Sequence, residues 1–91
     1  MKERLRMIIS GRVQGVFYRR SVFERALKLG LEGWVHNLDG GDVEVVAEGE
    51  RASLNKLMSW CWEGPPGAHV ENIESSWLKA ENVVGFKINY S

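Results

Sequence analysis

One glycine-bearing segment, residues 11–20, separates an alternating apolar stretch from an amphipathic one, and it constrains the fold more than any other feature of the chain. Its sequence is GRVQGVFYRR. A turn of this kind between a strand and a helix exposes several backbone N–H groups together, and the helix N-terminus adds a partial positive charge to them. An arginine just past the turn contributes a forked set of donors that suits phosphate or carboxylate. The segment therefore predicts a binding site for an oxyanion where a helix begins.

The apolar pattern around this segment predicts the order of the strands and helices. Alternating positions favour strands over residues 5–13, 31–37, 43–48, 70–78 and 84–90. Helical spacing predicts one helix that ends at Gly30 and a second that ends at the Gly64-Pro65-Pro66 break. We therefore expect a single domain over residues 1–91 with an α+β, ferredoxin-like sandwich. Its order is βαββαβ with a short extra C-terminal strand, and two helices cover one face of an antiparallel, partly mixed sheet.

The net charge of the chain is zero, but the charges are unevenly distributed. Residues 1–30 carry eight Lys/Arg and two Glu, a balance of +6, and the other residues have a balance of −6. A basic first third can steer anions toward a site, and the alternative is that the two parts form complementary surfaces. The single cysteine, Cys61, excludes an intrachain disulfide, and the apolar run Met7–Ile9 is too short for a signal peptide or a membrane span. We expect a cytoplasmic protein without membrane contact.

Two motifs resemble those of a known family. The first comprises Gly11, Val13, Gln14, Gly15, Val16 and Arg19, and the second is Gly33-Trp34-Val35-His36-Asn37. Together they resemble the acylphosphatases, small enzymes that hydrolyse the carboxyl–phosphate bond of acyl phosphates. The resemblance covers nearly the whole chain, including the Gly64–Gly67 break and the ending Phe86–Tyr90.

The resemblance implies roles for particular residues. The phosphoryl group would be bound by Arg19 and by the backbone N–H groups of residues 14–19, which are Gln14, Gly15, Val16, Phe17, Tyr18 and Arg19. Asn37 would position the attacking water. From the residues alone, Arg19 could instead be a surface arginine, although a helix start opposes its charge, and an asparagine before a hairpin is commonly a turn residue. Arg12 and Arg20 are expected to be surface residues beside the site.

The start of the first helix separates two interpretations. Ser21-Val22-Phe23-Glu24 is a capping-box pattern that would begin the helix at Ser21. The resemblance implies an earlier start near Tyr18, so that the N–H groups up to Arg19 face the phosphate. We expect the earlier start.

The implied reaction needs neither a general base nor a metal. A carboxylate is a weak base and can leave unprotonated, so positioning and electrostatic stabilisation suffice. His36, Cys61 and His69 lack metal-ligand spacing, and the segment at Gly11 lacks the Lys-Ser/Thr pair of a nucleotide-binding P-loop. The expected partner is a small-molecule acyl phosphate, with no cofactor, and the expected state is a monomer.

Two other functions remain as alternatives. One is an RNA-binding module, which Glu44 and Glu48 on a central strand and the zero net charge disfavour. The other is a catalytically silent acylphosphatase-like domain that binds or senses anions, which the presence of both Arg19 and Asn37 disfavours.

Overall fold

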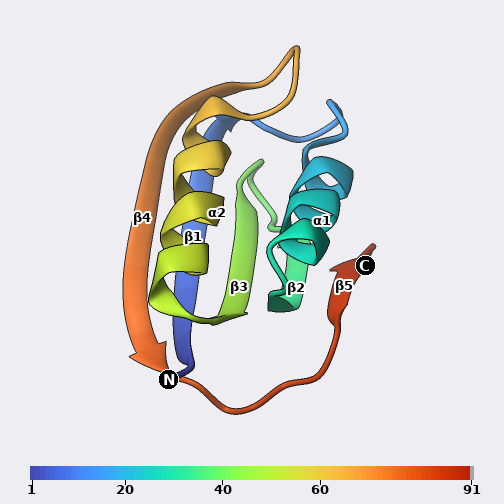
Figure 1. Ribbon diagram of the computed structural model, residues 1–91. Coiled ribbons are helices and arrows are strands. Elements are labelled where there is room, and N and C mark those ends of the chain that lie inside the picture. Colours follow the sequence, from blue (N-terminus) through green and yellow to red (C-terminus); the bar gives the residue numbers. More distant parts are fainter. Residues whose placement is uncertain (91) are drawn as a thin grey trace.

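The computed structural model describes residues 1–90 and contains five strands and two helices (Figure 1). In chain order they are β1 (Glu3–Arg12), α1 (Tyr18–Lys28), β2 (Glu32–Asn37), β3 (Val43–Gly49), α2 (Arg51–Glu63), β4 (His69–Lys79) and β5 (Phe86–Asn89). The strands form one sheet in the order β4-β1-β3-β2-β5. The expected ferredoxin-like sandwich with an added C-terminal strand is confirmed.

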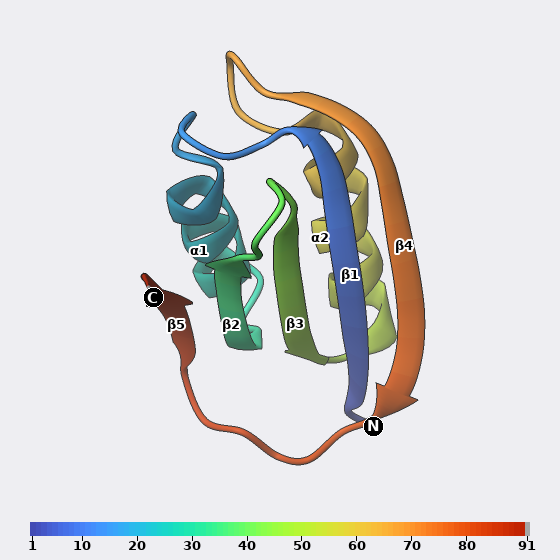
Figure 2. The same cartoon turned by 180° about the vertical axis from the view of Figure 1, so that it is seen from behind.

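Both helices lie on the same face of the sheet, and the opposite face is seen from behind in Figure 2. Alternate residues of the central strands point toward the helices and are buried, as Leu5, Met7 and Ile9 of β1 show. The core between the layers is completed by Val22 and Ala26 of α1 and by apolar residues of α2. This is the face that period-2 alternation in the strands and helical spacing in the helices predict.

Strand β1 changes register against β4 between Ser10 and Gly11, just before the glycine-bearing loop. Gly11 has φ 125°, and a Cβ atom there would lie 2.2 Å from the carbonyl oxygen of His69. Only glycine fits this close approach of two backbones. The irregularity ends the regular strand and releases the chain into the loop that precedes α1.

Strand β5 makes the sheet mixed, because it pairs parallel to β2 whereas the other pairs are antiparallel. A crossover over residues 80–85 passes along one end of the sheet from β4 at one edge to β5 at the other (Figures 1 and 2). The strand is shorter than the expected 84–90. Gly85 has φ 79° and its N–H donates to the Glu32 carboxylate, so the crossover extends to this residue.

Helix α1 begins at Tyr18, so the earlier start is confirmed. The Ser21 N–H donates to the Phe17 carbonyl at 3.0 Å, which places Ser21 inside the first turn rather than at the cap. The tyrosine is buried and its hydroxyl donates to the Cys61 carbonyl of α2 at 2.6 Å. This bond fixes the start of α1 to the end of α2, and packing therefore overrides the local capping pattern.

Candidate active site

The loop before α1 has the backbone geometry of an anion-binding concavity. Gly15 has φ 76° and Phe17 has φ 61°, while Val16 between them is not left-handed. Alternating handedness turns successive N–H groups toward one side of the chain. Among residues 1–90, no acceptor is found for the backbone N–H groups from Gln14 to Arg20. The loop therefore presents a continuous run of available donors at the positive end of α1.

The side chain of Gln14 has a structural task beside this loop. Its Nε2 donates to the carbonyl oxygens of Leu38 at 3.0 Å and Asp42 at 2.9 Å. Both acceptors belong to the turn between β2 and β3, directly after Asn37. Gln14 therefore joins the loop to the hairpin through its Nε2, and its backbone N–H remains available for a ligand.

Arg19 lies in the first turn of α1 and is held by the end of β5. Its Nη1 donates to the Asn89 carbonyl at 2.9 Å, and its guanidinium carbon lies 4.8 Å from the centre of the Tyr90 ring. The hydrogen bond and the cation–π contact restrict the side chain from two directions. No carboxylate among residues 1–90 pairs with this guanidinium, so its remaining donors are available.

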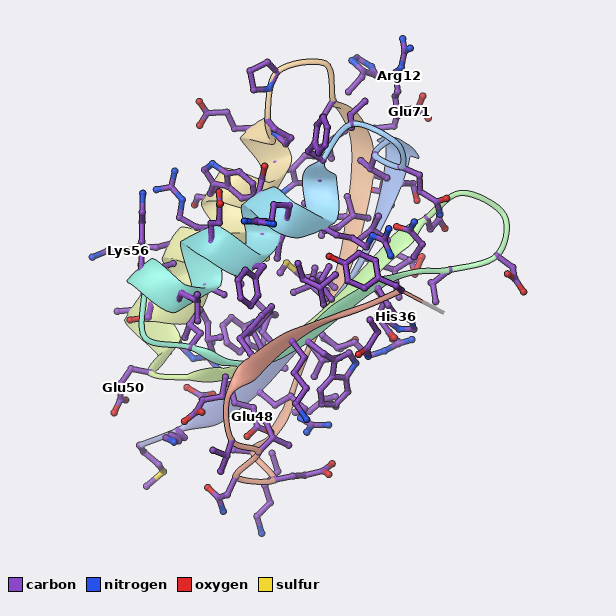
Figure 3. The ribbon with its side chains drawn as sticks, turned by 90° about the vertical axis from the view of Figure 1, so that its right-hand side faces the viewer. Arg12, His36, Glu48, Glu50, Lys56 and Glu71 are labelled. Atoms are coloured by element: carbon purple, nitrogen blue, oxygen red, sulfur yellow. The ribbon has the colours of Figure 1, made fainter. Side chains whose placement is uncertain are left out.

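The two neighbouring arginines are placed differently. Arg20, like Arg19, lines a cavity at the start of α1. Its Nε lies 3.3 Å from a carboxylate oxygen of Glu24, one turn along the exposed side of the helix. Arg12 does not line the cavity and lies at the end of β1, near Glu71 of the neighbouring strand in Figure 3. Of the three arginines, Arg19 is the one tied to the C-terminal strand.

Asn37 is the last residue of β2 and stands opposite Val43 in the hairpin. Its Oδ1 is buried and has no hydrogen-bond partner within the described chain. A buried acceptor without a donor costs about 1–3 kcal/mol, so this oxygen is suited to a donor from a bound molecule.

His36 directly precedes Asn37 in β2, so strand alternation places the two side chains on opposite faces of the sheet, and Figure 3 shows His36 on the face away from the helices. Its Nε2 is 2.5 Å from Oε1 of Glu44, whose other oxygen is 2.6 Å from Nε of Arg6. Partial burial raises the pKa of Glu44, but the bonds from His36 and Arg6 outweigh it and hold that pKa below its ordinary value. His36 therefore belongs to a chain of polar contacts with Glu44 and Arg6 and not to the cavity.

A cavity of about 390 Å³ gathers these features at the end of the sheet where α1 begins and where β2 and β5 end (Figure 1). It is lined by Val13, Gly15, Phe17, Tyr18, Arg19, Arg20, Asn37 and Tyr90. Arg19 and Asn37, which come from separate motifs, thus share one cavity. Val16 instead packs against the core.

Tyr90 is a cavity residue that sequence reasoning did not assign to the site, as are Val13 and Arg20. The alternation of Phe86, Ile88 and Tyr90 indicates a common strand face, but it does not say which strand lies beside β5. The contact with Arg19 follows from the parallel pairing of β5 with β2, which places their two ends together.

Neither buried nucleophile near the site is suited to attack. Burial raises the pKa of Tyr18 strongly and that of Cys61 to about 12, so both remain protonated at neutral pH. Within residues 1–90, no group of three or more His, Cys, Asp or Glu is arranged to hold a metal ion. The helices of the described chain also lack the length and apolar character needed to span a bilayer.

The family model and the curated relatives indicate one family. The family model described as acylphosphatase matches residues 5–88. An acylphosphatase of Pelotomaculum thermopropionicum is 42% identical over 90 residues, which cover 98% of each chain.

Two solved structures are similar over nearly their whole length. The acylphosphatase from Coxiella burnetii has a TM-score of 0.93 at 45% identity, covering 97% of this chain and 93% of that one. The acylphosphatase from Bacillus subtilis has a TM-score of 0.94 at 37% identity, covering 99% and 100% of the two chains. Since sequence and structure agree from β1 to β5, the chain belongs to the acylphosphatase family.

Proposed function

We propose that the protein hydrolyses the carboxyl–phosphate bond of acyl phosphates to a carboxylate and inorganic phosphate. One observation carries the proposal: loop residues whose N–H groups have no acceptor, Arg19, and Asn37, whose Oδ1 has no partner within the described chain, line one cavity. The loop and Arg19 suit a phosphoryl group, and Asn37 suits a water molecule beside it.

The phosphoryl group would be bound by the loop from Gln14 to Arg19. The backbone N–H groups of this loop donate to its oxygens, and the guanidinium spans two of them in its forked geometry. In the transition state the negative charge spreads over the three equatorial oxygens. Donors that are already oriented stabilise that charge without reorganisation, which is the dominant electrostatic contribution to catalysis.

Asn37 would hold the nucleophile. A water that donates one hydrogen to its Oδ1 satisfies the buried acceptor and keeps its own lone pair free for phosphorus. The water oxygen forms the new P–O bond as the bond between phosphorus and the acyl oxygen breaks. The carboxylate leaves with that electron pair, and the water's proton passes to the phosphate product.

The remaining parts of the proposal concern the state of the protein. We place it as a single-domain monomer in the cytoplasm that acts without a metal, because Arg19 supplies the positive charge that a metal would contribute. The alternative of a silent anion-binding domain shares the phosphate site but requires no water position. Asn37 lines the same cavity and its Oδ1 has no partner within the described chain, which favours turnover over that alternative.

A substrate comparison tests this function. Acetyl phosphate and an aryl phosphate monoester are offered at neutral pH, and phosphate release is measured. We expect rapid release from acetyl phosphate and almost none from the ester, because the cavity offers no acid to protonate a poorer leaving group. Equal rates on both substrates would contradict the proposal, and absence of turnover would favour the silent domain.

The same assay with a chelator tests whether activity requires a metal ion. Activity should be unchanged after dialysis against a strong chelator. A loss that magnesium or zinc restores would contradict metal independence.

A further inference from the structure

A second cavity, of about 450 Å³, lies between β2, β5 and the crossover that joins β4 to β5. Its volume is within the range of small-molecule sites. The second cavity shares no lining residue with the cavity at the start of α1, so the proposed hydrolysis does not use it. Its lining includes Trp34 of β2, Lys87 and Asn89 of β5, and Val83 and Val84 of the crossover.

Trp34 and Lys87 lie side by side on the sheet face away from the helices. The two residues are register partners in the parallel pair of β2 and β5. Phe86, the neighbour of Lys87 in β5, is buried in the core beneath the helices, and strand alternation therefore turns Lys87 to the other face. Figure 2 shows this face, where β5 is an edge strand and no helix covers it. An aromatic ring and a cation thus line one cavity on an uncovered face.

The ring of Trp34 is held in place by a buried arginine. The guanidinium carbon of Arg4 lies 5.2 Å from the centre of the ring. Arg4 is 8% exposed, and its own position is fixed by Glu48 at 2.7 Å and by Glu81 at 3.2 Å. Trp34 itself is only partly buried, so its ring keeps accessible surface for a ligand. A ring that is already oriented loses little conformational freedom when it stacks on a ligand.

Lys87 brings a positive charge that has no carboxylate partner among residues 1–90. Two carboxylates accept N–H bonds from crossover residues that line the second cavity, and both already have cationic partners. Glu32 pairs with Lys2 at 3.3 Å, and Glu48 pairs with Arg4. These carboxylates are held by other cations, so the Lys87 ammonium is available for a negatively charged ligand.

The donors of the second cavity suit a carboxylate better than a phosphate. The loop before α1 offers a run of backbone N–H groups and a forked guanidinium, which match the several oxygens of a phosphoryl group. The second cavity offers one ammonium and the backbone N–H of Val84, for which no acceptor is found within residues 1–90. These donors match the single charge and the two oxygens of a carboxylate. Val83 and Val84 add apolar surface beside the ring.

We propose that the second cavity binds a small aromatic carboxylate, with its ring stacked on Trp34 and its carboxylate at the Lys87 ammonium and the Val84 N–H. Offset stacking on the indole and burial against the two valines stabilise the ring, and the charge pair fixes its orientation. The inference does not depend on the proposed hydrolysis, because the two cavities have separate linings. It gives the chain a second ligand site, on the sheet face away from the helices.

The test is a titration of isotope-labelled protein with 2-naphthoate, followed by NMR in an excess of inorganic phosphate that occupies the first cavity. We expect saturable shifts of the Trp34 indole N–H and of the Gly33 and Gly85 amide resonances. The dissociation constant should be roughly 0.1–1 mM, as is ordinary for a ligand of this size. Cyclohexanecarboxylate lacks the aromatic ring and 2-naphthylmethanol lacks the charge, so each should bind at least about 3-fold more weakly.

Two variants separate the contributions of the charge and the ring. Lys87→Met keeps a long side chain and removes the ammonium, so it should weaken 2-naphthoate binding by about 5-fold and leave 2-naphthylmethanol binding unchanged. Trp34→Leu removes the stacking surface and should weaken both ligands by about 5-fold or more. Lys56→Met, on the exposed side of α2, is the matched control and should change neither affinity. The Lys87 variant decides the test alone if Trp34→Leu does not fold.

Three results would overturn the inference. Shifts confined to the loop before α1 would place the ligand in the first cavity. Equal affinities for 2-naphthoate and cyclohexanecarboxylate, or an affinity that Lys87→Met does not change, would remove the ring or the charge from recognition. Tighter binding of 2-naphthyl phosphate at the same resonances would make the second cavity a phosphate site rather than a carboxylate site.

Discussion

Arg19 and Arg20 are adjacent arginines in the same helical turn, but their surroundings assign them different tasks. The guanidinium of Arg19 is held by Asn89 and Tyr90 and has no carboxylate partner within residues 1–90, whereas Arg20 pairs with Glu24. Arg19→Gln should lower kcat/KM by about 10³-fold or more, because transition-state charge on the phosphoryl oxygens loses its cationic partner. It should also abolish competitive inhibition by inorganic phosphate.

The matched variant Arg20→Gln should retain most activity and nearly normal phosphate inhibition. The kcat/KM value and the inhibition constant of phosphate can both be measured in one steady-state assay with acetyl phosphate. The reverse pattern would assign the phosphate to Arg20 and would require a different orientation of the ligand in the cavity.

Asn37 permits a separation between holding water and holding phosphate. Asn37→Ala should lower kcat by about 10²–10³-fold, as the loss of one oriented polar group at a reacting centre typically does. The inhibition constant of phosphate should change little, since the loop and Arg19 remain. The free energy of unfolding should change by less than about 1 kcal/mol, because the buried Oδ1 makes no hydrogen bond within the described chain. Nearly normal turnover with a large stability loss would instead make Asn37 a turn residue.

At this scale the sequence predicted some features of the site and missed others. Residue type and spacing indicated an oxyanion site at the glycine-bearing loop and the arginine that follows it, and the family resemblance supplied the roles predicted for Arg19 and Asn37. They could not reveal the contact between Arg19 and Tyr90, which joins residues far apart in sequence. Residue type and spacing also could not show that the Gln14 side chain binds the hairpin. The acceptors of its two hydrogen bonds are backbone carbonyl groups, which every residue type carries.

At the scale of elements, the site depends on how the loop before α1 is fixed to the β2–β3 hairpin. Gln14 provides this connection through two hydrogen bonds from one amide. Gln14→Met keeps the length of the side chain and removes both donors. We expect the free energy of unfolding to fall by about 1–2 kcal/mol, since each bond contributes roughly 1 kcal/mol.

The same variant should also lower kcat, because the loop and Asn37 would no longer be held at a fixed separation. Denaturation midpoints and acetyl phosphate kinetics measure the two effects. The variant Lys56→Met on the exposed side of α2 is a control for the substitution itself. A stability loss with unchanged kcat would mean that the connection supports the fold alone.

The strands and helices themselves were predicted more successfully than the pairing between the strands. Local apolar periodicity indicates each strand and helix, because burial of one face is a local property of the sequence. The pairing of β5 with β2 is parallel and joins strands across the whole second half of the chain, so no local pattern encodes it. The start of α1 also depends on contacts that are distant in sequence. The local pattern at Ser21 indicated a helix cap, but the helix begins at Tyr18, whose side chain is buried.

At the scale of the whole molecule, the uneven charge distribution of the sequence corresponds to ion pairs between neighbouring strands. Basic residues of the first third pair with acidic residues of the rest, as Arg4 does with Glu48 and Arg6 with Glu44. The two parts therefore form complementary surfaces, which was one of the two interpretations of the charge pattern. Within residues 1–90, Arg19 takes no part in these carboxylate pairs.

Glu48 is the most buried of these charges and connects the sheet to the crossover before β5 (Figure 3). Its carboxylate is 0% exposed and accepts from Arg4 Nε at 2.7 Å and from the backbone N–H groups of Glu81 at 2.8 Å and Val83 at 3.1 Å. The crossover leads directly into β5, which holds Arg19 through Asn89 and Tyr90. Glu48 should therefore influence the site from the other end of the sheet.

The pH dependence of stability tests this connection. Burial raises the pKa of Glu48, but the hydrogen bonds from Glu81, Arg4 and Val83 outweigh it, so the folded-state pKa lies below its ordinary value of 4.5. A lowered pKa means that the carboxylate stabilises the fold fully above pH 4.5 and that this contribution is lost as the pH falls through the folded-state pKa. The free energy of unfolding should accordingly decline below pH 4.5, and Glu48→Gln should flatten that decline.

At neutral pH, Glu48→Gln should cost about 3 kcal/mol or more, because it leaves the buried Arg4 without its main charge partner. It should also lower activity on acetyl phosphate at temperatures where the variant remains folded, since a loosened crossover no longer fixes β5 beside Arg19. The matched control is Glu44→Gln on the same sheet face, which loses partners in Arg6 and His36 but touches no part of the crossover. If both variants lose stability and activity equally, Glu48 acts only through general electrostatics. A loss of activity confined to Glu48→Gln would instead show that Glu48 of β3 positions Arg19 through the crossover and β5.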